Sequence, residues 1–137
     1  MLLDTVVSDC LQRCMDLCSK RHVLIANNIA NVNTPGYKRL DLEFDKIMRQ
    51  EVGRQLGERS PTELWRTHPQ HQTPVREQGF VAVQADYGTA HRNDGNNVDI
   101  DFEMALLASN QLTYEAAARL LNGELGLLWK AVSEGRR

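Results

Sequence analysis

The sequence predicts a mainly α-helical protein whose two ends form long amphipathic helices that pack as a coiled-coil-like pair. Two observations support this prediction. Apolar residues recur every three or four positions over residues 1–32 and again over residues 98–137. Residues 33–97 between them are polar and richer in Pro and Gly, so we expect a partly disordered middle segment with a short β element. The 137 residues suffice for one domain.

The N-terminal segment has the pattern of one long helix. No Gly or Pro precedes Pro35, and about 30 helical residues would span roughly 45 Å. One apolar row consists of Leu3, Val7, Cys10, Cys14, Leu17 and Leu24. A second row beside it consists of Leu11, Met15, Cys18, Ile25, Ile29 and Val32. Because charged side chains fall mostly outside both rows, we expect this wide face to be buried.

This helix is expected to stop within residues 27–37. Four asparagines fall within seven residues here, and their side chains compete with the helix for backbone hydrogen bonds. Pro35 disfavours a helical Thr34, and Pro35 with Gly36 suits the centre of a type II turn, in which Gly takes the positive φ. Tyr37 then offers an aromatic anchor with one polar tip.

The middle segment gives weaker signals. We expect a short helix over residues 41–52 and a short strand over residues 79–84. Three of the four prolines lie farther along this segment than Pro35, and much of residues 53–78 is expected to be mobile. Residues 94–99 look like a calcium-binding loop but fail the EF-hand template, so we interpret them as a turn into the last helix.

The C-terminal segment mirrors the first. Its main apolar row consists of Leu107, Tyr114, Ala118, Leu121, Leu125, Leu128 and Val132. A neighbouring row consists of Phe102, Ala105, Leu106, Leu112, Ala116, Ala117 and Leu120. We expect Asp99 or Asp101 to accept the free amide hydrogens of the first turn, and Glu103 to complement the helix dipole there. Gly123 and Gly126 are unusual inside such a helix, since each costs on the order of 1 kcal/mol relative to Ala.

Composition and motifs argue against several classes of function. A net charge of −2 does not favour nucleic-acid binding, and no apolar run approaches the roughly 18 residues of a membrane span. The first residues lack the basic and apolar regions of a cleaved secretory signal. No nucleophile elbow, P-loop or dinucleotide motif is present, so we expect neither an enzyme nor a bound cofactor.

Two groups of potential metal ligands are better explained without a metal. Cys10, Cys14 and Cys18 lie on one helical row, whereas zinc and iron–sulfur sites take cysteines from loops at other spacings. Free Cys behaves as a small hydrophobe, so we expect this row to pack in a core or an interface. The other group lies in the polar middle without carboxylates at ligand spacing, and consists of His68, His71 and His91.

A single pair of amphipathic helices buries only one seam, so the remaining apolar surface requires other molecules. This pattern indicates a subunit of a larger assembly. The residues expected at the assembly interface are Leu3, Val7, Cys10, Cys14, Leu17, Leu24, Leu107, Tyr114, Ala118, Leu121, Leu125 and Leu128. An alternative hypothesis is a small coiled-coil adaptor that binds one partner helix and stops at a defined complex.

Both ends of the chain resemble the axial proteins of bacterial flagella, which form the rod, the hook and the hook-associated structures. The N-terminal signature of that family is roughly N-x-A-N-x-x-T-x-G-Y/F. It is filled here by Asn28, Ala30, Asn31, Thr34, Gly36 and Tyr37, with Pro35 between them. The terminal helix of the family is similar to this chain at residues 97–99, 103–104, 114–116 and 121–122. The short length, with residues 33–38 and 94–101, is most similar to the proximal rod members.

The resemblance implies a structural role in a hollow drive shaft that crosses the periplasm, with the terminal helices packed side by side along its inner tube. It implies export through the flagellar type III apparatus without a cleaved signal. It also implies assembly with other copies, adjoining rod proteins, the FliE adaptor and the MS ring. In such an assembly the turn at Pro35 and Gly36 would set the exit of the chain from the inner tube, with Tyr37 as its anchor.

Overall fold

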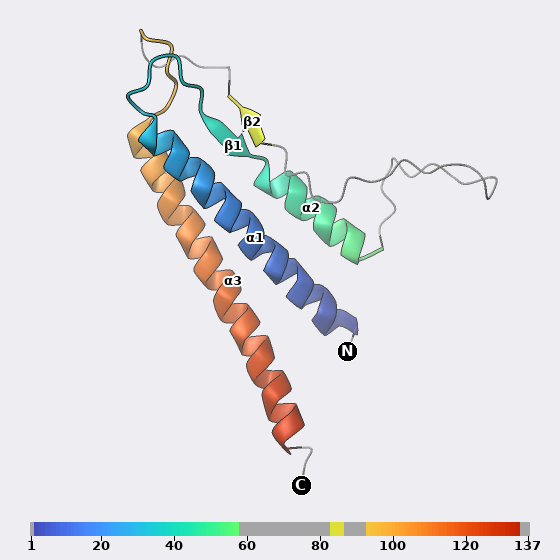
Figure 1. Ribbon diagram of the computed structural model, residues 1–137. Coiled ribbons are helices and arrows are strands. Elements are labelled where there is room, and N and C mark those ends of the chain that lie inside the picture. Colours follow the sequence, from blue (N-terminus) through green and yellow to red (C-terminus); the bar gives the residue numbers. More distant parts are fainter. Residues whose placement is uncertain (1, 58–82, 87–92, 135–137) are drawn as a thin grey trace, which may run out of the picture.

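The computed structural model describes residues 2–57, 83–86 and 93–134, and it describes side chains from Val6 onward in the first range. Within these ranges the chain forms the elements α1 (Leu2–Ala30), β1 (Leu40–Leu42), α2 (Phe44–Gln55), β2 (Val83–Ala85) and α3 (Ile100–Glu134). The prediction of a mainly α-helical chain with a long helix at each end and a small β element is confirmed (Figure 1).

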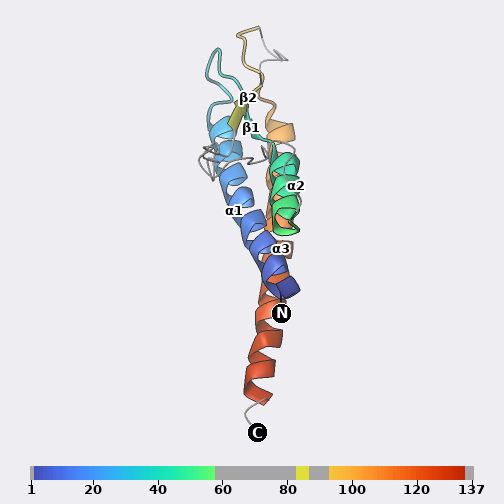
Figure 2. The same ribbon diagram turned by 90° about the vertical axis from the view of Figure 1, so that its right-hand side faces the viewer.

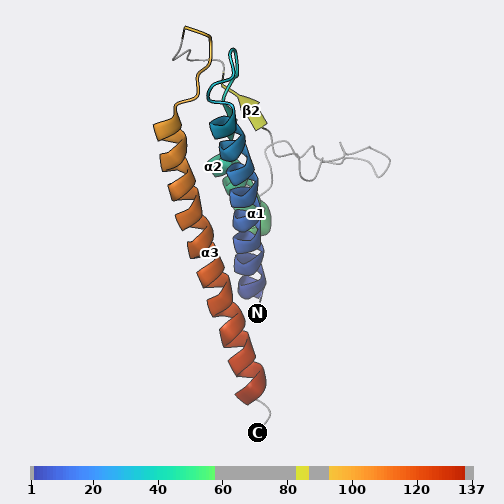
Figure 3. The same ribbon diagram turned by 60° about the vertical axis from the view of Figure 1, so that its left-hand side comes forward.

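The two long helices, α1 and α3, lie side by side and run in opposite directions (Figure 1). α1 contacts α3 along one side and contacts α2 and β1 along another (Figures 1 and 2). The 29 residues of α1 span about 44 Å and the 35 residues of α3 about 52 Å. The C-terminal part of α3 therefore extends beyond the N-terminal end of α1 (Figure 3).

The strands β1 and β2 form an antiparallel pair in which Leu40 lies opposite Ala85 and Leu42 opposite Val83. Side chains alternate between the two faces of a strand. β1 lies against α1, and its Leu42 is buried. The strand pair therefore holds β2, which lies more than forty residues after β1, beside the N-terminal helix α1.

The apolar core of the single chain is small. Among the described residues, the buried apolar side chains are Leu17, Cys18, Ile25, Leu42, Val98 and Ala117. A buried polar contact accompanies them, because Asn110 Nδ2 donates to the Cys18 carbonyl oxygen at 2.9 Å. From Leu125 to Glu134 every residue of α3 is exposed. The seam between α1 and α3 thus ends well before α3 does.

The shorter elements differ in position from the prediction. The helix expected over 41–52 is α2, which begins three residues later because residues 40–42 pair with β2 instead. α2 also continues to Gln55, so residues 53–55 of the segment expected to be mobile are helical. The expected strand over 79–84 overlaps β2 at residues 83 and 84, and its remainder lies outside the described residues, as do residues 58–78.

Candidate functional site

The chain turns sharply after α1, as the sequence predicts. The carbonyl oxygen of Thr34 accepts the N–H of Tyr37 at 3.3 Å, and Gly36 has a φ of 71°. A positive φ at the residue after Pro35 is the geometry of a type II turn. The N–H of Gly36 also donates to the Asp94 carbonyl oxygen at 3.0 Å, so the turn is tied to the loop that precedes α3.

Asn28 is fully buried near the end of α1 and uses its whole amide group. Its Nδ2 donates to the Leu40 carbonyl oxygen at 2.8 Å and to Glu103 Oε2 at 3.2 Å. Its Oδ1 accepts the Leu40 N–H at 2.9 Å and the Tyr37 hydroxyl at 3.2 Å. An amide side chain has two donor hydrogens and two acceptor lone pairs, so each has a partner here. Asn28 therefore pairs with β1 as a neighbouring strand would.

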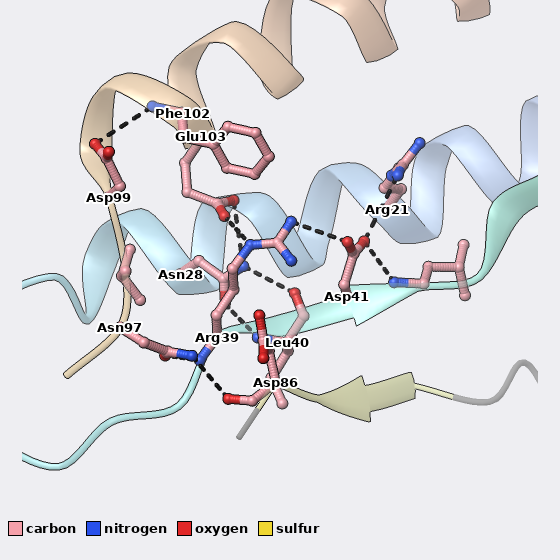
Figure 4. A network of polar contacts seen from close by, with 12 residues as sticks. Arg21, Asn28, Arg39, Leu40, Asp41, Asp86, Asn97, Asp99, Phe102 and Glu103 are labelled. Atoms are coloured by element: carbon pink, nitrogen blue, oxygen red, sulfur yellow. Dashed lines mark hydrogen bonds and ion pairs between the residues drawn. The ribbon is translucent and has the colours of Figure 1, made fainter. Parts of the chain in front are cut away.

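Glu103, in the first turn of α3, is fully buried and accepts a hydrogen bond from each of two elements (Figure 4). The Nε of Arg39 donates to its Oε1 at 2.6 Å, and Asn28 donates to its Oε2. The Arg39 guanidinium is itself 2.9 Å from Asp41 and lies over the Phe102 ring, 5.2 Å from the ring centroid. A buried charge is tolerated only when it is paired and hydrogen-bonded, and both conditions hold for this pair.

Asn96, in the segment before α3, binds the turn that follows α1. Its Nδ2 lies 3.0 Å from the carbonyl oxygens of Asn31, Val32 and Thr34. Backbone carbonyl groups in a turn lack the regular partners of a helix or sheet, so donors from other segments satisfy them. The Oδ1 of Asn96 accepts the Val98 N–H at 2.8 Å, and the residue is fully buried.

Asn97 joins the strand pair to the segment before α3 (Figure 4). Its Oδ1 accepts the Arg39 N–H at 2.8 Å, and its Nδ2 donates to the Asp86 carbonyl oxygen at 2.7 Å. The next carboxylate, Asp99, is the N-cap of α3, because its Oδ1 accepts the N–H of Asp101 at 3.0 Å. Of the two capping residues that the sequence allows, Asp99 therefore takes the role.

Electrostatics agrees with this arrangement. Burial alone lowers the pKa of the Arg39 guanidinium, but the hydrogen bond to Glu103 and the charge of Asp41 outweigh it and raise that pKa above its ordinary value. Burial, and secondly the charge of Glu103, raise the pKa of the Tyr37 hydroxyl. Tyr37 is therefore a neutral donor at physiological pH. We call these side chains the end-joining cluster: Asn28, Tyr37, Arg39, Asn96, Asn97 and Glu103.

Comparison with known proteins identifies the family. Residues 24–38, which contain Asn28 and the turn, match the family model described as "Flagella basal body rod protein". The flagellar basal body rod protein FlgB of Bacillus subtilis is 30% identical over 126 residues, which cover 92% of each chain. FlgB of Borrelia hermsii is 39% identical over 111 residues, which cover 77% of this chain and 80% of that protein.

This chain belongs to the FlgB family of flagellar basal body rod proteins. FlgB of Escherichia coli K12 is also similar, at 29% identity over 126 residues that cover 90% of this chain and 91% of that protein. Membership makes this FlgB-family chain a component of the flagellar basal body rod that associates with other basal body components. The resemblance of the two ends to flagellar axial proteins is thereby confirmed.

The structure unites the two family motifs that the sequence places at opposite ends. Asn28 and Tyr37 belong to the end-joining cluster through their side chains, and Asn31 and Thr34 contact it through carbonyl oxygens that lie 3.0 Å from Asn96 Nδ2. Gly36 is tied instead to Asp94 by its N–H. The remaining predicted motif residues, Ala30 and Pro35, are exposed. The Asn31 side chain makes local contacts, since its Nδ2 donates to the Asn27 carbonyl oxygen at 2.8 Å and its Oδ1 accepts the Thr34 hydroxyl at 3.2 Å.

Sequence reasoning did not predict the roles of Arg39, Asn96 and Glu103. Glu103 was expected to complement the helix dipole, whereas it is buried and paired with Arg39. A signal was available, because Glu103, Asn110 and Ala117 are spaced by seven residues and therefore share one helix face. All three are buried in this FlgB-family chain.

The predicted interface residues divide by exposure. Leu17 is fully buried within the single chain. Six are partly exposed: Cys10, Cys14, Leu24, Leu107, Ala118 and Leu121. Four are exposed: Val7, Tyr114, Leu125 and Leu128. The side chain of Leu3 lies outside the described residues.

The cysteine row packs as free thiols. Cys18 is buried, and Cys10 and Cys14 are partly buried. Burial, and secondly the neighbouring Cys14, raise the pKa of the Cys18 thiol to about 11. A thiol with a raised pKa carries little reactive thiolate at neutral pH. This agrees with the predicted packing role of the row.

No cluster of three or more metal-ligating side chains occurs among the residues that the structure describes. His68, His71 and His91 lie outside those residues. Within the same ranges, none of the helices combines the length and apolar character that crossing a membrane requires.

Proposed function

We propose that this chain is a self-assembling structural subunit of the proximal rod, packed helically with other copies and with adjoining rod proteins into the shaft that transmits motor torque. The observation that carries the proposal is the uncovered apolar surface of α3. The large apolar side chains of α3 that are exposed in the single chain are Ile100, Phe102, Met104, Leu112, Tyr114, Leu120, Leu125, Leu127, Leu128, Trp129 and Val132.

One part of this surface continues the seam with α1. Ala117 is buried in the single chain and Leu121 is partly buried, whereas Leu125, Leu128 and Val132 follow at spacings of three and four and are exposed. Residues at this spacing share one helix face, so the apolar face of α3 that packs against α1 continues past the end of α1. Among the described residues, none packs against that continuation. A helix from another subunit would complete the seam.

A second row runs along α3 beside the first. It consists of Phe102, Ala105, Ser109, Leu112, Ala116, Leu120, Gly123 and Leu127, all exposed. Apart from the buried Glu103, four charged residues of α3 share one strip by their spacing, namely Asp101, Glu115, Arg119 and Lys130, whereas Glu124 and Glu134 lie outside it. A helix that is apolar over most of its circumference is typical of a buried position. α3 is therefore suited to the interior of an assembly, with more than one helical neighbour.

The free energy available from apolar burial supports assembly when each subunit contacts several neighbours. Complete burial of a large apolar side chain contributes about 1.5–3 kcal/mol. The exposed apolar side chains of α3 named above are already partly covered, so burying all of them contributes on the order of 10 kcal/mol for each subunit. Association costs translational and rotational freedom of comparable size. Stable association therefore requires several neighbours, which a helical array provides.

The same proposal includes the finer assignments of partners and location. We include adjoining rod proteins, the FliE adaptor and the MS ring as neighbours, and export from the cytoplasm through the flagellar type III apparatus without a cleaved signal. The role is structural and not enzymatic. Membership of the FlgB family supports the location in the rod, because its curated members are named as rod proteins.

The test is a double variant on the extended seam, Leu125→Asp with Leu128→Asp, expressed in a bacterium that lacks its own FlgB. The matched control is Lys130→Asp on the charged strip. We expect normal basal bodies and motility with the control, and loss of rods with the double variant. Purified wild-type chain should crosslink into a ladder of oligomers, and the double variant should remain monomeric with unchanged helix content. A single complex of fixed size would support the adaptor hypothesis instead.

A further inference from the structure

The smaller elements form one unit on the side of the helix pair. We call this unit the arm; it consists of residues 37–57 and 83–86, which include β1, α2 and β2. Within the described residues, α3 makes no close backbone approach to α2, β1 or β2. The contacts between the arm and α3 are made by side chains, chiefly that of Arg39, which meets Glu103 and the Phe102 ring.

We infer that Glu103 is a positioning residue that closes the arm onto α3, so that the arm has a second, open position in which α1 and α3 remain packed. The Glu103 carboxylate lies where α1, α3 and the arm meet. One oxygen binds Arg39 of the arm, and the other binds Asn28 of α1 (Figure 4). The same Asn28 amide holds the backbone of Leu40 in β1.

The charge of Glu103 is central to this role. Arg39 is 11% exposed at its side chain, and its remaining counter-ion is Asp41, which is 36% exposed. Removing one partner of a buried ion pair leaves the other charge without compensation, which is strongly destabilising. Without Glu103, the Arg39 guanidinium reaches water most easily if β1 moves away from α3. The whole arm follows, because Arg39 precedes β1 directly.

The rest of the molecule permits such a local opening. α2 has no buried residue, and in the strand pair only Leu42 is buried. Segments with little buried apolar area open at lower free energy than the whole fold. The seam between α1 and α3 has its own contacts, including the bond from Asn110 to the Cys18 carbonyl oxygen, seven residues and about 10 Å along α3 from Glu103.

The test is amide hydrogen exchange on the full-length chain. The variant Glu103→Met removes the carboxylate, and Glu115→Met is the matched control, since Glu115 is an exposed glutamate on the same helix paired with Arg119. We expect exchange at Arg39 and Leu40, whose N–H groups donate outside the arm to Asn97 and Asn28, to accelerate about a hundredfold or more in Glu103→Met relative to the control. Exchange at the α1–α3 seam around Cys18 and Asn110 should change less than about threefold.

Two further variants guard against a trivial loss of folding. The double variant Arg39→Met with Glu103→Met replaces both charges with apolar side chains, and such a replacement is often neutral. We expect it to restore slow exchange in the arm to within about tenfold of wild type. Glu103→Gln keeps an acceptor oxygen for Asn28 but no charge, and should accelerate exchange in the arm while the seam stays protected. The inference is overturned by unchanged exchange in the arm, by equal acceleration in the seam, or by a double variant as open as Glu103→Met.

Discussion

Replacement of Asn28 by Leu offers a direct test of how the two ends of the chain are joined. The side chains are similar in volume, so the change mainly removes hydrogen bonds. It takes one partner each from the N–H and the carbonyl oxygen of Leu40, from Glu103 and from the Tyr37 hydroxyl. A buried polar group left without its partner costs about 1–3 kcal/mol. Because Leu40 is partly exposed, water compensates in part, and we expect a loss of about 2–4 kcal/mol in the free energy of unfolding.

The matched control is Asn31→Leu, three residues farther along the same motif. Asn31 donates to the Asn27 carbonyl oxygen and accepts the Thr34 hydroxyl, and both contacts are solvent-exposed, so its replacement should cost less than about 1 kcal/mol. Urea unfolding followed by circular dichroism measures both, with the m-value checked for constancy. If the two variants lose the same stability within about 0.5 kcal/mol, Asn28 does not hold β1 and the assignment of the cluster is wrong.

Two other predictions concern the turn and the cysteine row. Gly36→Val should block rod assembly, because a side chain at a φ of 71° costs about 1–2 kcal/mol, and more when it is β-branched. Gly36→Asn should retain rods, because Asn tolerates a positive φ. Motile cells with a normal yield of rods in Gly36→Val would contradict this prediction. Because the pKa of Cys18 is raised from 9.0 to about 11 in the folded chain, folding favours the neutral thiol. The Cys18 contribution to the free energy of unfolding is therefore complete below pH 9 and is lost as the pH rises towards 11. Unfolding measured over this range should show a smaller alkaline decline in Cys18→Ala, and an identical decline would refute the assignment.

The long helices could be predicted because their information is local. Apolar spacing, the absence of Gly and Pro before Pro35, and the carboxylate at Asp99 each act within a few residues. The turn at Pro35 and Gly36 is equally local, since two residue types restrict their own backbone angles. These features appear in the structure as the sequence indicates.

The partners of the polar residues were not predictable in the same way. Asn28 lies in an asparagine-rich segment, which by itself predicts only the end of a helix. The sequence does not indicate that Leu40, or Glu103 75 residues away, completes its hydrogen bonds. The short helix was misplaced by three residues for a similar reason. Residues 40–42 form a strand because β2 supplies a partner from more than forty residues farther along the chain.

The sequence by itself determined that this chain has two amphipathic helices, a turn between the first helix and a polar middle, and more apolar surface than one helix pair can bury. Each of these follows from the spacing or backbone preference of neighbouring residues. Only the tertiary structure decided which polar side chains meet, because a buried carboxylate or amide needs partners that distant segments supply. The packing of α1 against α3 brings those segments together. Glu103 is therefore a buried carboxylate that joins them and not an exposed side chain at the start of a helix.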